Sequence, residues 1–280
     1  MKIIVAGTGF VGLTHAAVCS EYGHEVYAYD IDEKKLNAYR SGEAEQINHY
    51  VNEPGLAEII AENKDRYLFF SSDLEGIIEG TDAIFLCLPT PPNVDGSSDL
   101  SFYFKAVDHI CTLLAKRADT RRIVLINKST VPIGTARQLE RKLHEYNVPN
   151  AGVASNPEFL PEGDAVEKSR RPDRVTVGAD TDEDFRIIRR IYSQFVNHVR
   201  IRYIETTPET AEAIKYVANT LLLTYISFWN GVGARLGETF ANIRMEDLKR
   251  GVTADNRIST WGSYVSNGAG GSCFGKDIQS

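Results

Sequence analysis

The segment Gly270-Gly271-Ser272-Cys273-Phe274-Gly275-Lys276-Asp277 brings a cysteine together with residues that could make it reactive. Glycines on either side let a substrate approach the sulfur, and the cation of Lys276 favours the thiolate. A free thiol has a pKa of about 8.5 and is only a few per cent ionised near neutrality, so a nucleophile gains from such help. Taken alone, the segment is more typical of a flexible loop with an incidental cysteine.

The remaining cysteines, Cys19, Cys87 and Cys111, lie in apolar stretches. In such surroundings cysteine usually packs as a small hydrophobic side chain. The sequence shows neither a Cys-x-x-Cys pair nor a cluster of histidines near a cysteine, so it predicts no metal site.

A second group of residues has the spacing of a phosphate-binding turn. The run Gly7-Thr8-Gly9-Phe10-Val11-Gly12 follows a strand-like stretch and opens a helix-like one. Glycines at these places permit a tight turn, close approach of a pyrophosphate and close helix packing, while the helix N-terminus attracts phosphate. Asp30 ends the next strand, where a carboxylate binds ribose hydroxyls and repels a 2′-phosphate. The pattern predicts NAD rather than NADP, and a turn without a ligand is the alternative.

Three further segments follow strand-like stretches. Leu88–Pro92 and Lys128–Pro132 would lie at the carboxyl ends of strands, where ligands bind in open α/β sheets, or would be ordinary proline-bounded turns. Asn156–Gly163 contains Glu158 and Glu162, which would form either part of a site or a solvated acidic turn.

Residues 207–237 predict a long helix. Thr207 can cap it and Pro208 suits its first position. Its apolar surface is wider than packing on a sheet edge needs, so a helix between domains or one buried in a dimer is expected. Lys215 and Asn219 share one face of it. That pair is either a solvent stripe or a buried site.

These groups must be positioned by elements that alternate between strand-like and helix-like stretches, which predicts a doubly wound, Rossmann-type α/β sheet. Strands are expected over residues 2–6, 25–29, 69–71, 83–88, 123–126, 153–155 and 174–177. Helices are expected over 11–22, from about 33, and over about 244–251. We predict a nucleotide-binding domain over 1–204, and a central helix, a small helical region and the cysteine segment over 205–280.

Composition excludes several classes of protein. The 280 residues carry a net charge of -7, which argues against nonspecific binding to nucleic acid or to anionic membranes. No apolar run is long enough to span a bilayer, and the N-terminus shows no secretory leader. A cytoplasmic location is expected.

Six motifs, taken in order, resemble the UDP-glucose/GDP-mannose dehydrogenase family. They are the glycine run, Pro-Thr-Pro, Lys-Ser-Thr-Val-Pro, Asn-Pro-Glu-Phe-Leu-x-Glu-Gly, Lys-x-x-x-Asn and Gly-Gly-Ser-Cys-x-x-Lys-Asp. The match runs from Met1 to Asp277. Members of this family oxidise the C6 alcohol of a nucleotide sugar twice and reduce two NAD, so the resemblance implies that reaction.

The resemblance also implies catalytic roles. Cys273 would attack the aldehyde formed first, giving a thiohemiacetal and then a thioester that water hydrolyses. Lys215 and Asn219 would stabilise the oxyanions that develop at C6. Asp277 would order a water, and Glu162 with Thr130 would assist the hydrolysis.

The binding residues that the resemblance implies form two sets. NAD would be held by the glycine run together with Asp30, Lys35, Thr90, Thr130, Glu162 and Lys276. The nucleotide sugar would contact Glu158, Phe159, Leu160, Glu162, Lys215, Asn219 and Arg257. The family also implies a homodimer through the central helix, with Arg257 reaching across it.

Within the family, Asp255-Asn256-Arg257-Ile258 before the cysteine motif resembles the UDP-glucose 6-dehydrogenases, so UDP-glucose is the expected substrate. Ala269 stands where the family usually has an aromatic residue, and Gly275 replaces a larger one. GDP-mannose and a UDP-N-acetylhexosamine therefore remain alternative substrates. Residues 44–52 look like a small insertion.

Family members continue past the cysteine motif into a second α/β domain, so we interpret the chain as C-terminally truncated, with that domain absent and little activity alone. One alternative is an inactive NAD-binding and dimerisation fragment. Another is a hydroxyacid dehydrogenase of the wider 6-phosphogluconate-type group, which needs one hydride transfer and no cysteine.

Overall fold

The computed structural model describes residues 1–263. The predictions for Cys273, Lys276 and Asp277 lie outside the described residues. The chain forms two compact units, the first made of residues 1–91 and 99–213, the second of 92–98 and the chain from 214 onward. The domain boundary that the sequence suggests between residues 204 and 205 stays a prediction.

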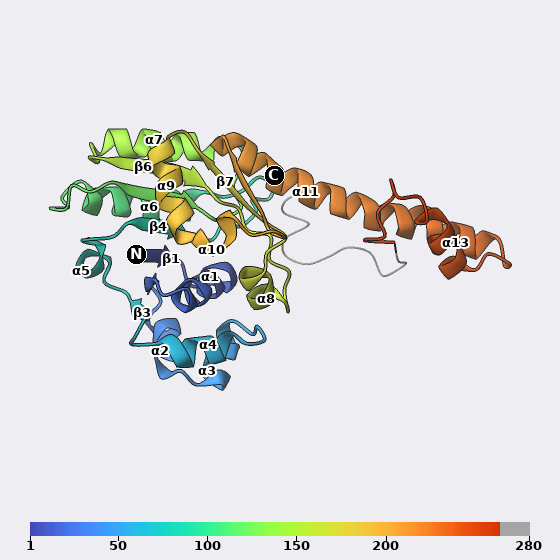
Figure 1. Ribbon diagram of the computed structural model, residues 1–280, viewed down its shortest axis with the longest axis horizontal. Helices are drawn as coiled ribbons and strands as arrows, with labels where there is room; N and C mark the ends of the chain where they lie inside the picture. Colours follow the sequence, from blue (N-terminus) through green and yellow to red (C-terminus); the bar gives the residue numbers. More distant parts are fainter. Residues whose placement is uncertain (264–280) are drawn as a thin grey trace. The chain divides into compact units, whose positions relative to one another are not determined.

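The first unit is built on one eight-stranded sheet (Figure 1), in the order β3-β2-β1-β4-β5-β6-β7-β8. All neighbours pair in parallel except β6 and β7, which pair antiparallel. The chain order reverses direction between β1 and β4, which is where doubly wound sheets bind ligands. The strands are β1 (Lys2–Ala6), β2 (Glu25–Tyr29), β3 (Leu68–Ser71), β4 (Ala83–Leu86), β5 (Ile123–Asn127), β6 (Ala151–Ser155), β7 (Arg174–Ala179) and β8 (Arg202–Thr206).

Helices cover both faces of this sheet. One face carries α1 (Phe10–Glu21), α2 (Glu33–Ser41), α3 (Ala44–Tyr50), α4 (Leu56–Asn63), α8 (Ala165–Arg170), α9 (Asp182–Ile191) and α10 (Ser193–Val196). The other carries α5 (Leu74–Ile78), α6 (Ser101–Leu114) and α7 (Thr135–Glu145). The expected Rossmann-type fold is therefore confirmed.

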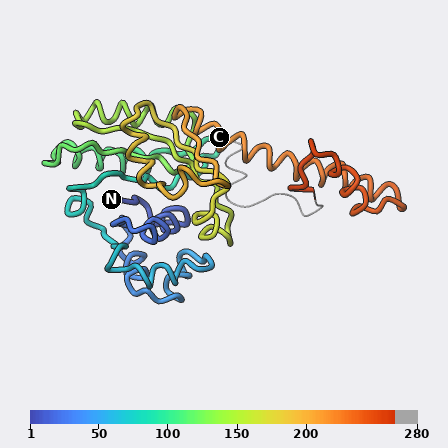
Figure 2. The backbone as a smooth tube through the Cα atoms, in the orientation of Figure 1, coloured from blue at the N-terminus to red at the C-terminus, as the bar shows by residue number. Residues whose placement is uncertain are grey.

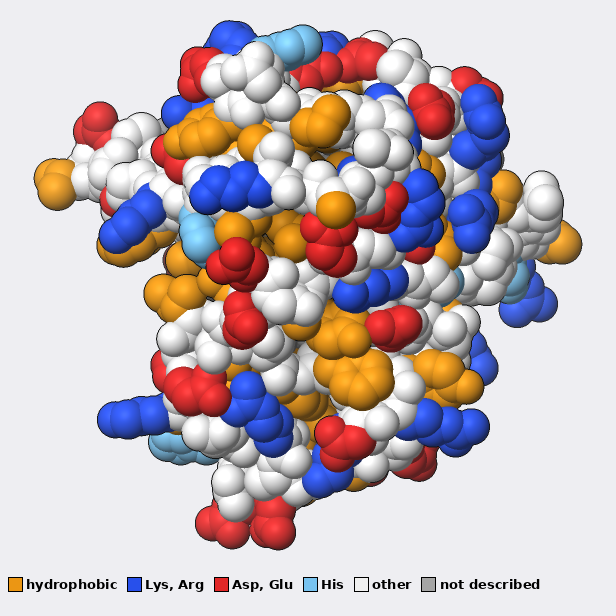
Figure 3. Space-filling model, turned by 90° about the vertical axis from the view of Figure 1, so that its left-hand side faces the viewer, with side chains coloured by type: hydrophobic (Ala, Val, Ile, Leu, Met, Phe, Trp, Pro, Cys, Tyr) orange, Lys and Arg blue, Asp and Glu red, His pale blue; other side chains and the backbone are white. Residues whose placement is uncertain are grey.

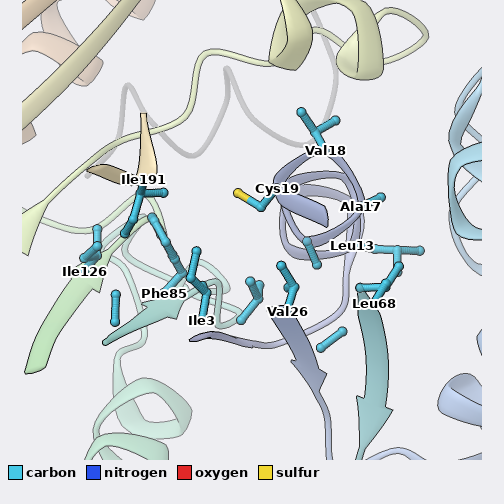
Figure 4. Packing of buried hydrophobic residues seen from close by; sticks show 14 of the residues in the cluster. Ile3, Leu13, Ala17, Val18, Cys19, Val26, Leu68, Phe85, Ile126 and Ile191 are labelled. Atoms are coloured by element: carbon cyan, nitrogen blue, oxygen red, sulfur yellow. The ribbon is translucent and has the colours of Figure 1, made fainter. Parts of the chain in front are cut away.

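The core lies between these layers because successive strand residues face opposite sides. Ile3 and Val5 of β1 join one apolar cluster, whereas Ile4 and Ala6 join the other. Strands that are buried on both faces read as continuous apolar runs, which is why these strands could be predicted from the sequence. Figure 4 shows Leu13 of α1 gathered with side chains from the strands of the first cluster.

Three details differ from the sequence-based prediction. The strand expected over 83–88 ends at Leu86, because the N–H of Leu88 donates to the hydroxyl of Ser129 and not to a neighbouring strand. β8 was not predicted, since its residues are half-buried or exposed and carry a weak apolar signal. The apparent insertion at 44–52 contains α3.

The last part of the described chain is helical. It comprises α11 (Pro208–Phe228), a π-helical turn (Trp229–Gly233), α12 (Ala234–Thr239) and α13 (Met245–Val252). Figure 2 traces α11 as one continuous path. The start of α11 at Pro208 agrees with the prediction, and the hydroxyl of Thr207 accepts the N–H of Thr210 at 3.3 Å. No helix within residues 1–263 combines the length and apolarity needed to cross a bilayer.

Charged side chains of both signs are interspersed over the face drawn in Figure 3. Such mixing is typical of a solvated protein surface.

Candidate active site

The predicted motifs converge at one edge of the sheet. The register pairs Ala6 with Tyr29 and with Leu86, then Leu86 with Asn127, and Asn127 with Ser155. These residues lie at the carboxyl ends of five adjacent parallel strands. The glycine run, Asp30, the Pro-Thr-Pro loop, the Lys-Ser-Thr-Val-Pro loop and the acidic loop therefore leave the sheet side by side.

The glycine run forms a turn that larger residues could not make. Gly7 has a φ of 95°, and a Cβ there would lie 2.3 Å from the carbonyl oxygen of Cys87. A Cβ on Gly12 would lie 1.8 Å from the carbonyl oxygen of Gly7. Gly9 precedes α1 without a side-chain cap, and a Cβ there would meet no atom within 4 Å. The turn thus brings bare backbone to the N-terminus of α1, as a bound pyrophosphate requires.

Asp30 is held in place beside this turn. Its Oδ2 accepts the N–H of Thr8 at 2.8 Å, the hydroxyl of Thr8 at 2.7 Å and the Lys35 ammonium at 2.9 Å. Burial by itself would raise the pKa of Asp30, but these hydrogen bonds outweigh burial and lower it. The carboxylate is therefore ionised and oriented, in the state that binds ribose hydroxyls.

The two threonines predicted for the NAD site meet. The hydroxyl of Thr90 donates to the backbone carbonyl of Thr130 at 3.0 Å. Ser129 joins the same loops, because its N–H bonds to the carbonyl of Leu86 at 2.9 Å and its hydroxyl accepts the N–H of Leu88 at 2.8 Å. Sequence reasoning gave Ser129 no role, although it lies within the motif.

The two acids of the next loop differ in their surroundings. Glu158 is buried, and its Oε2 accepts the N–H of Leu160 at 2.7 Å. Glu162 is exposed. The Arg174 guanidinium lies 3.8 Å from the centre of the Phe159 ring. Glu158 therefore holds the backbone of its own loop, whereas Glu162 is exposed to solvent. The binding roles of both acids stay predictions.

Behind this loop lies a cavity of about 80 Å³, large enough for several water molecules. The Lys128 ammonium lies 3.1 Å from Oδ1 of Asn156, which also accepts the hydroxyl of Tyr192 at 2.5 Å. The amide nitrogen of Asn156 donates to the carbonyl of Thr176 at 2.7 Å. Burial lowers the pKa of His15, which also lines the cavity, well below its usual value. This network fixes the first residue of the acidic loop.

Lys215 and Asn219, which the sequence predicts on one face of α11, do not form a solvent-exposed stripe. Lys215 is 5% exposed, and Asn219 is half-buried. Arg257, predicted to contact substrate, is exposed, and its guanidinium lies 2.6 Å from the carboxylate of Asp255.

The described cysteines are poor nucleophiles. Cys19 and Cys111 are buried, and burial raises the pKa of each to about 12. Burial raises the pKa of the half-buried Cys87 to about 12 as well.

Two family models match the chain. The model for the UDP-glucose/GDP-mannose dehydrogenase family, NAD binding domain, matches residues 1–196, and the model for its central domain matches residues 209–280. The chain belongs to the UDP-glucose/GDP-mannose dehydrogenase family. Its cofactor is therefore NAD, and the open backbone at Gly9 and the oriented carboxylate of Asp30 fit that dinucleotide.

Members of this family from several organisms are similar to the chain. The UDP-glucose 6-dehydrogenase of Pseudomonas aeruginosa is 36% identical over 290 residues, which cover 100% of this chain and 60% of that protein. The UDP-glucose 6-dehydrogenase of Rhizobium meliloti is 35% identical, with 99% and 62% covered. A UDP-glucose dehydrogenase structure from Pyrobaculum islandicum superposes with a TM-score of 0.87 at 33% identity, over 99% of this chain and 62% of that one. The chain spans about three fifths of the length of these relatives.

Two buried glutamates that the sequence did not single out hold the family motifs in place. Glu53 accepts the N–H groups of Gly163 at 2.6 Å and Ala165 at 3.0 Å, where the acidic loop enters α8. Glu212 accepts the N–H groups of Gly134 and Ala136, where the Lys-Ser-Thr-Val-Pro loop enters α7. Burial raises the pKa of Glu212, although these hydrogen bonds favour its ionised form.

Proposed function

We propose that the protein oxidises the C6 alcohol of UDP-glucose to the carboxylate of UDP-glucuronate in two NAD-linked steps. The observation that carries this proposal is the convergence of four family motifs and Asp30 at the ends of five adjacent strands. The choice of UDP-glucose as the substrate is supported by two relatives at 35–36% identity that are named UDP-glucose 6-dehydrogenases. The reaction itself is inferred from the resemblance of the six motifs to those of the family.

The first unit has the features needed to bind and orient the cofactor. Its pyrophosphate would lie on the turn at Gly7–Gly12, and the adenosine ribose against Asp30. The Thr90–Thr130 hydrogen bond links two loops that would flank the dinucleotide. Bound NAD⁺ supplies the hydride acceptor for both oxidations.

The remaining chemistry belongs to side chains of this chain. Lys215 and Asn219 would stabilise the oxyanion at C6, a task for fixed donors. After the first oxidation the thiolate of Cys273 would add to the aldehyde carbon and form a carbon–sulfur bond. Loss of hydride from that carbon would leave a thioester. Water, assisted by Glu162 and Thr130 and ordered by Asp277, would displace the sulfur and release the acid. The pKa values raised to about 12 at Cys19, Cys87 and Cys111 support Cys273 as the nucleophile.

We propose a homodimer that forms through α11. Val217, Leu221 and Phe228 of this helix are 65%, 55% and 53% exposed, a series of large apolar side chains that is typical of a protein interface. A cytoplasmic location stays a prediction.

The reaction is tested with the protein in its natural full length. NADH formation is measured with UDP-glucose, GDP-mannose and UDP-N-acetylglucosamine, and the product is weighed by mass spectrometry. We expect UDP-glucose to be preferred, with two NADH formed for each uronate. The Cys273→Ala variant should lose uronate formation yet keep NAD binding.

Other outcomes would favour the alternatives. One NADH for each substrate, with full activity in Cys273→Ala, would indicate a hydroxyacid-type dehydrogenase. NAD binding without oxidation of any nucleotide sugar would indicate a binding module.

A further inference from the structure

The carboxylate of Glu212 connects three parts of the first unit. It is 4% exposed. Its Oε2 accepts the N–H of Gly134 at 2.7 Å, and its Oε1 accepts the N–H of Ala136 at 2.9 Å and the hydroxyl of Ser155 at 3.0 Å. These partners lie at the start of α7 and at the end of β6, whereas Glu212 itself lies in the second turn of α11.

Each partner adjoins a segment with a proposed role in the reaction. Gly134 follows Thr130 by four residues. Ser155 directly precedes the acidic loop that ends with Glu162 and Gly163. Lys215 and Asn219 follow Glu212 on α11 by three and seven residues, and residues at these spacings share one side of a helix. Glu212 is thus hydrogen-bonded beside both loops and lies on the same side of α11 as Lys215 and Asn219.

A capping role alone does not account for this arrangement. The start of α7 has no side-chain cap of its own, because Gly134 occupies that position. A short exposed Ser or Asp could accept such N–H groups without placing a charge in the interior. A buried carboxylate on another helix instead makes the position of α7 and the rotation of α11 depend on each other.

Glu209, one turn earlier on α11, provides the comparison. Its carboxylate pairs with Arg137 of α7 at 2.6 Å, but both side chains are more than a third exposed. Arg137 also pairs with Asp180 and Glu140. Glu209 therefore links the same two helices at the surface, where solvent competes and other acids can replace it.

We propose that Glu212 is a positioning residue. It fixes the rotation of the first turns of α11 relative to the start of α7 and the end of β6. The helical repeat then determines the side of α11 on which Lys215 and Asn219 lie. This inference rests on the proposed function, because the benefit of a fixed rotation is realised in the oxidation at C6.

The test compares Glu212→Gln with Glu209→Gln in the full-length protein. Glutamine keeps the shape of Glu212 but turns an amide donor toward one of the two N–H groups, which leaves that group without an acceptor. We measure kcat for UDP-glucose for each NAD-binding site, so that misfolded protein does not count, together with KM for NAD. Displacement of catalytic groups by about an ångström costs roughly a hundredfold in rate. We therefore expect kcat of Glu212→Gln to fall roughly tenfold to a hundredfold, with KM for NAD within about twofold of wild type. Glu209→Gln should match wild type.

A purely structural role would lower the number of NAD-binding sites but not kcat for each site. A kcat within about twofold of wild type in Glu212→Gln would therefore overturn the proposal, since displaced groups should cost far more. If Glu212→Gln binds no NAD, Glu212→Asp, which keeps the charge but shortens its reach, is judged by the same measurement and the same limit.

If wild-type protein oxidises no nucleotide sugar, the proposed function fails, and amide hydrogen exchange decides the positioning role. Faster exchange in Glu212→Gln at residues 129–136 and 208–219 together, without the same change in Glu209→Gln, would support it. Unchanged exchange in either stretch would overturn it.

Discussion

The two units of the chain differ in how far their large apolar side chains are buried. In the first unit, strands β4 and β5 are fully buried between two helical layers. In residues 214–263 of the second, Ile226 and Trp229 are the large apolar side chains that are buried, whereas Val217, Leu221, Phe228 and Phe240 are more than half exposed.

The apolar side chains of the first unit thus stabilise the fold, whereas those of the second unit form an exposed apolar surface. A sheet covered on both faces removes apolar surface from water within one chain, which is the main source of folding free energy. An apolar helix face that remains exposed gains that free energy only when another surface covers it. Stability should therefore depend mainly on the first unit, and association on the second.

The largest effect is expected for truncation of the first core. Phe85 is fully buried and packs edge-on against the ring of His15 at 4.3 Å between centroids, so Phe85→Ala should cost about 3–5 kcal/mol in unfolding free energy. Phe228→Ala, in the second unit, should change the unfolding free energy of the dissociated monomer by less than about 0.5 kcal/mol. Urea unfolding followed by circular dichroism measures both. Equal losses in the two variants would remove the distinction between the units.

We expect the proposed dimer to be weakened by substitutions on α11 and not by substitutions in the first unit. Leu221→Asp places a charge on the exposed apolar face, and we expect the proposed dimer to weaken at least about a hundredfold, or about 2.8 kcal/mol. Sedimentation at micromolar concentration measures the change, and an unchanged affinity for NAD is the control. A dimer as tight as wild type would show that another surface pairs the chains.

Cofactor choice should depend on the first unit. Asp30 should make NAD bind at least about tenfold better than NADP, or about 1.4 kcal/mol, by accepting ribose hydroxyls and repelling the extra phosphate. Asp30→Asn should reduce this preference. Asp32→Asn, which alters the exposed cap of α2, should not. Titration calorimetry measures the six affinities, and equal affinities of wild type for the two dinucleotides would contradict the assignment.

The smallest effect concerns pH. Because the folded pKa of Asp30 is lowered, its contribution to stability is present above its unfolded pKa of about 3.9 and is lost as pH falls through the folded pKa. Asp30→Asn lacks this contribution, so the wild type should lose more stability than the variant between neutral and acid pH. Urea midpoints across that range measure the difference. Parallel curves would mean that the hydrogen bonds of Asp30 leave its pKa unchanged.

The sequence predicted those parts of the fold that local signals specify. Buried strands such as β1 are apolar runs, and α11 begins where a proline follows a threonine. The antiparallel direction of β7 was not predicted, because alternating residues such as Val175 and Val177 look the same for a strand that runs either way. A strand's direction is set by how the chain returns to the sheet.

In the candidate site, too, only the parts that local signals specify could be predicted from the sequence. Residues within the motifs could be named from spacing, and the strand ends at which most of them lie follow from the alternating pattern. Glu53 and Glu212 could not, since their hydrogen bonds join positions 110 and 78 residues apart. Neither the charge nor the spacing of a lone glutamate indicates which distant backbone it will reach.

The strand order also has a consequence for synthesis on the ribosome. One edge of β1 must wait for β4, which begins about fifty residues after β2 ends, so at roughly 5–20 residues per second this apolar edge stays open for about 3–10 s. From β4 to β8, however, each new strand adds beside the one before it. The nascent sheet can then grow at a single edge in the order in which the chain emerges, and the period of greatest exposure to aggregation falls early, before β4 has been made.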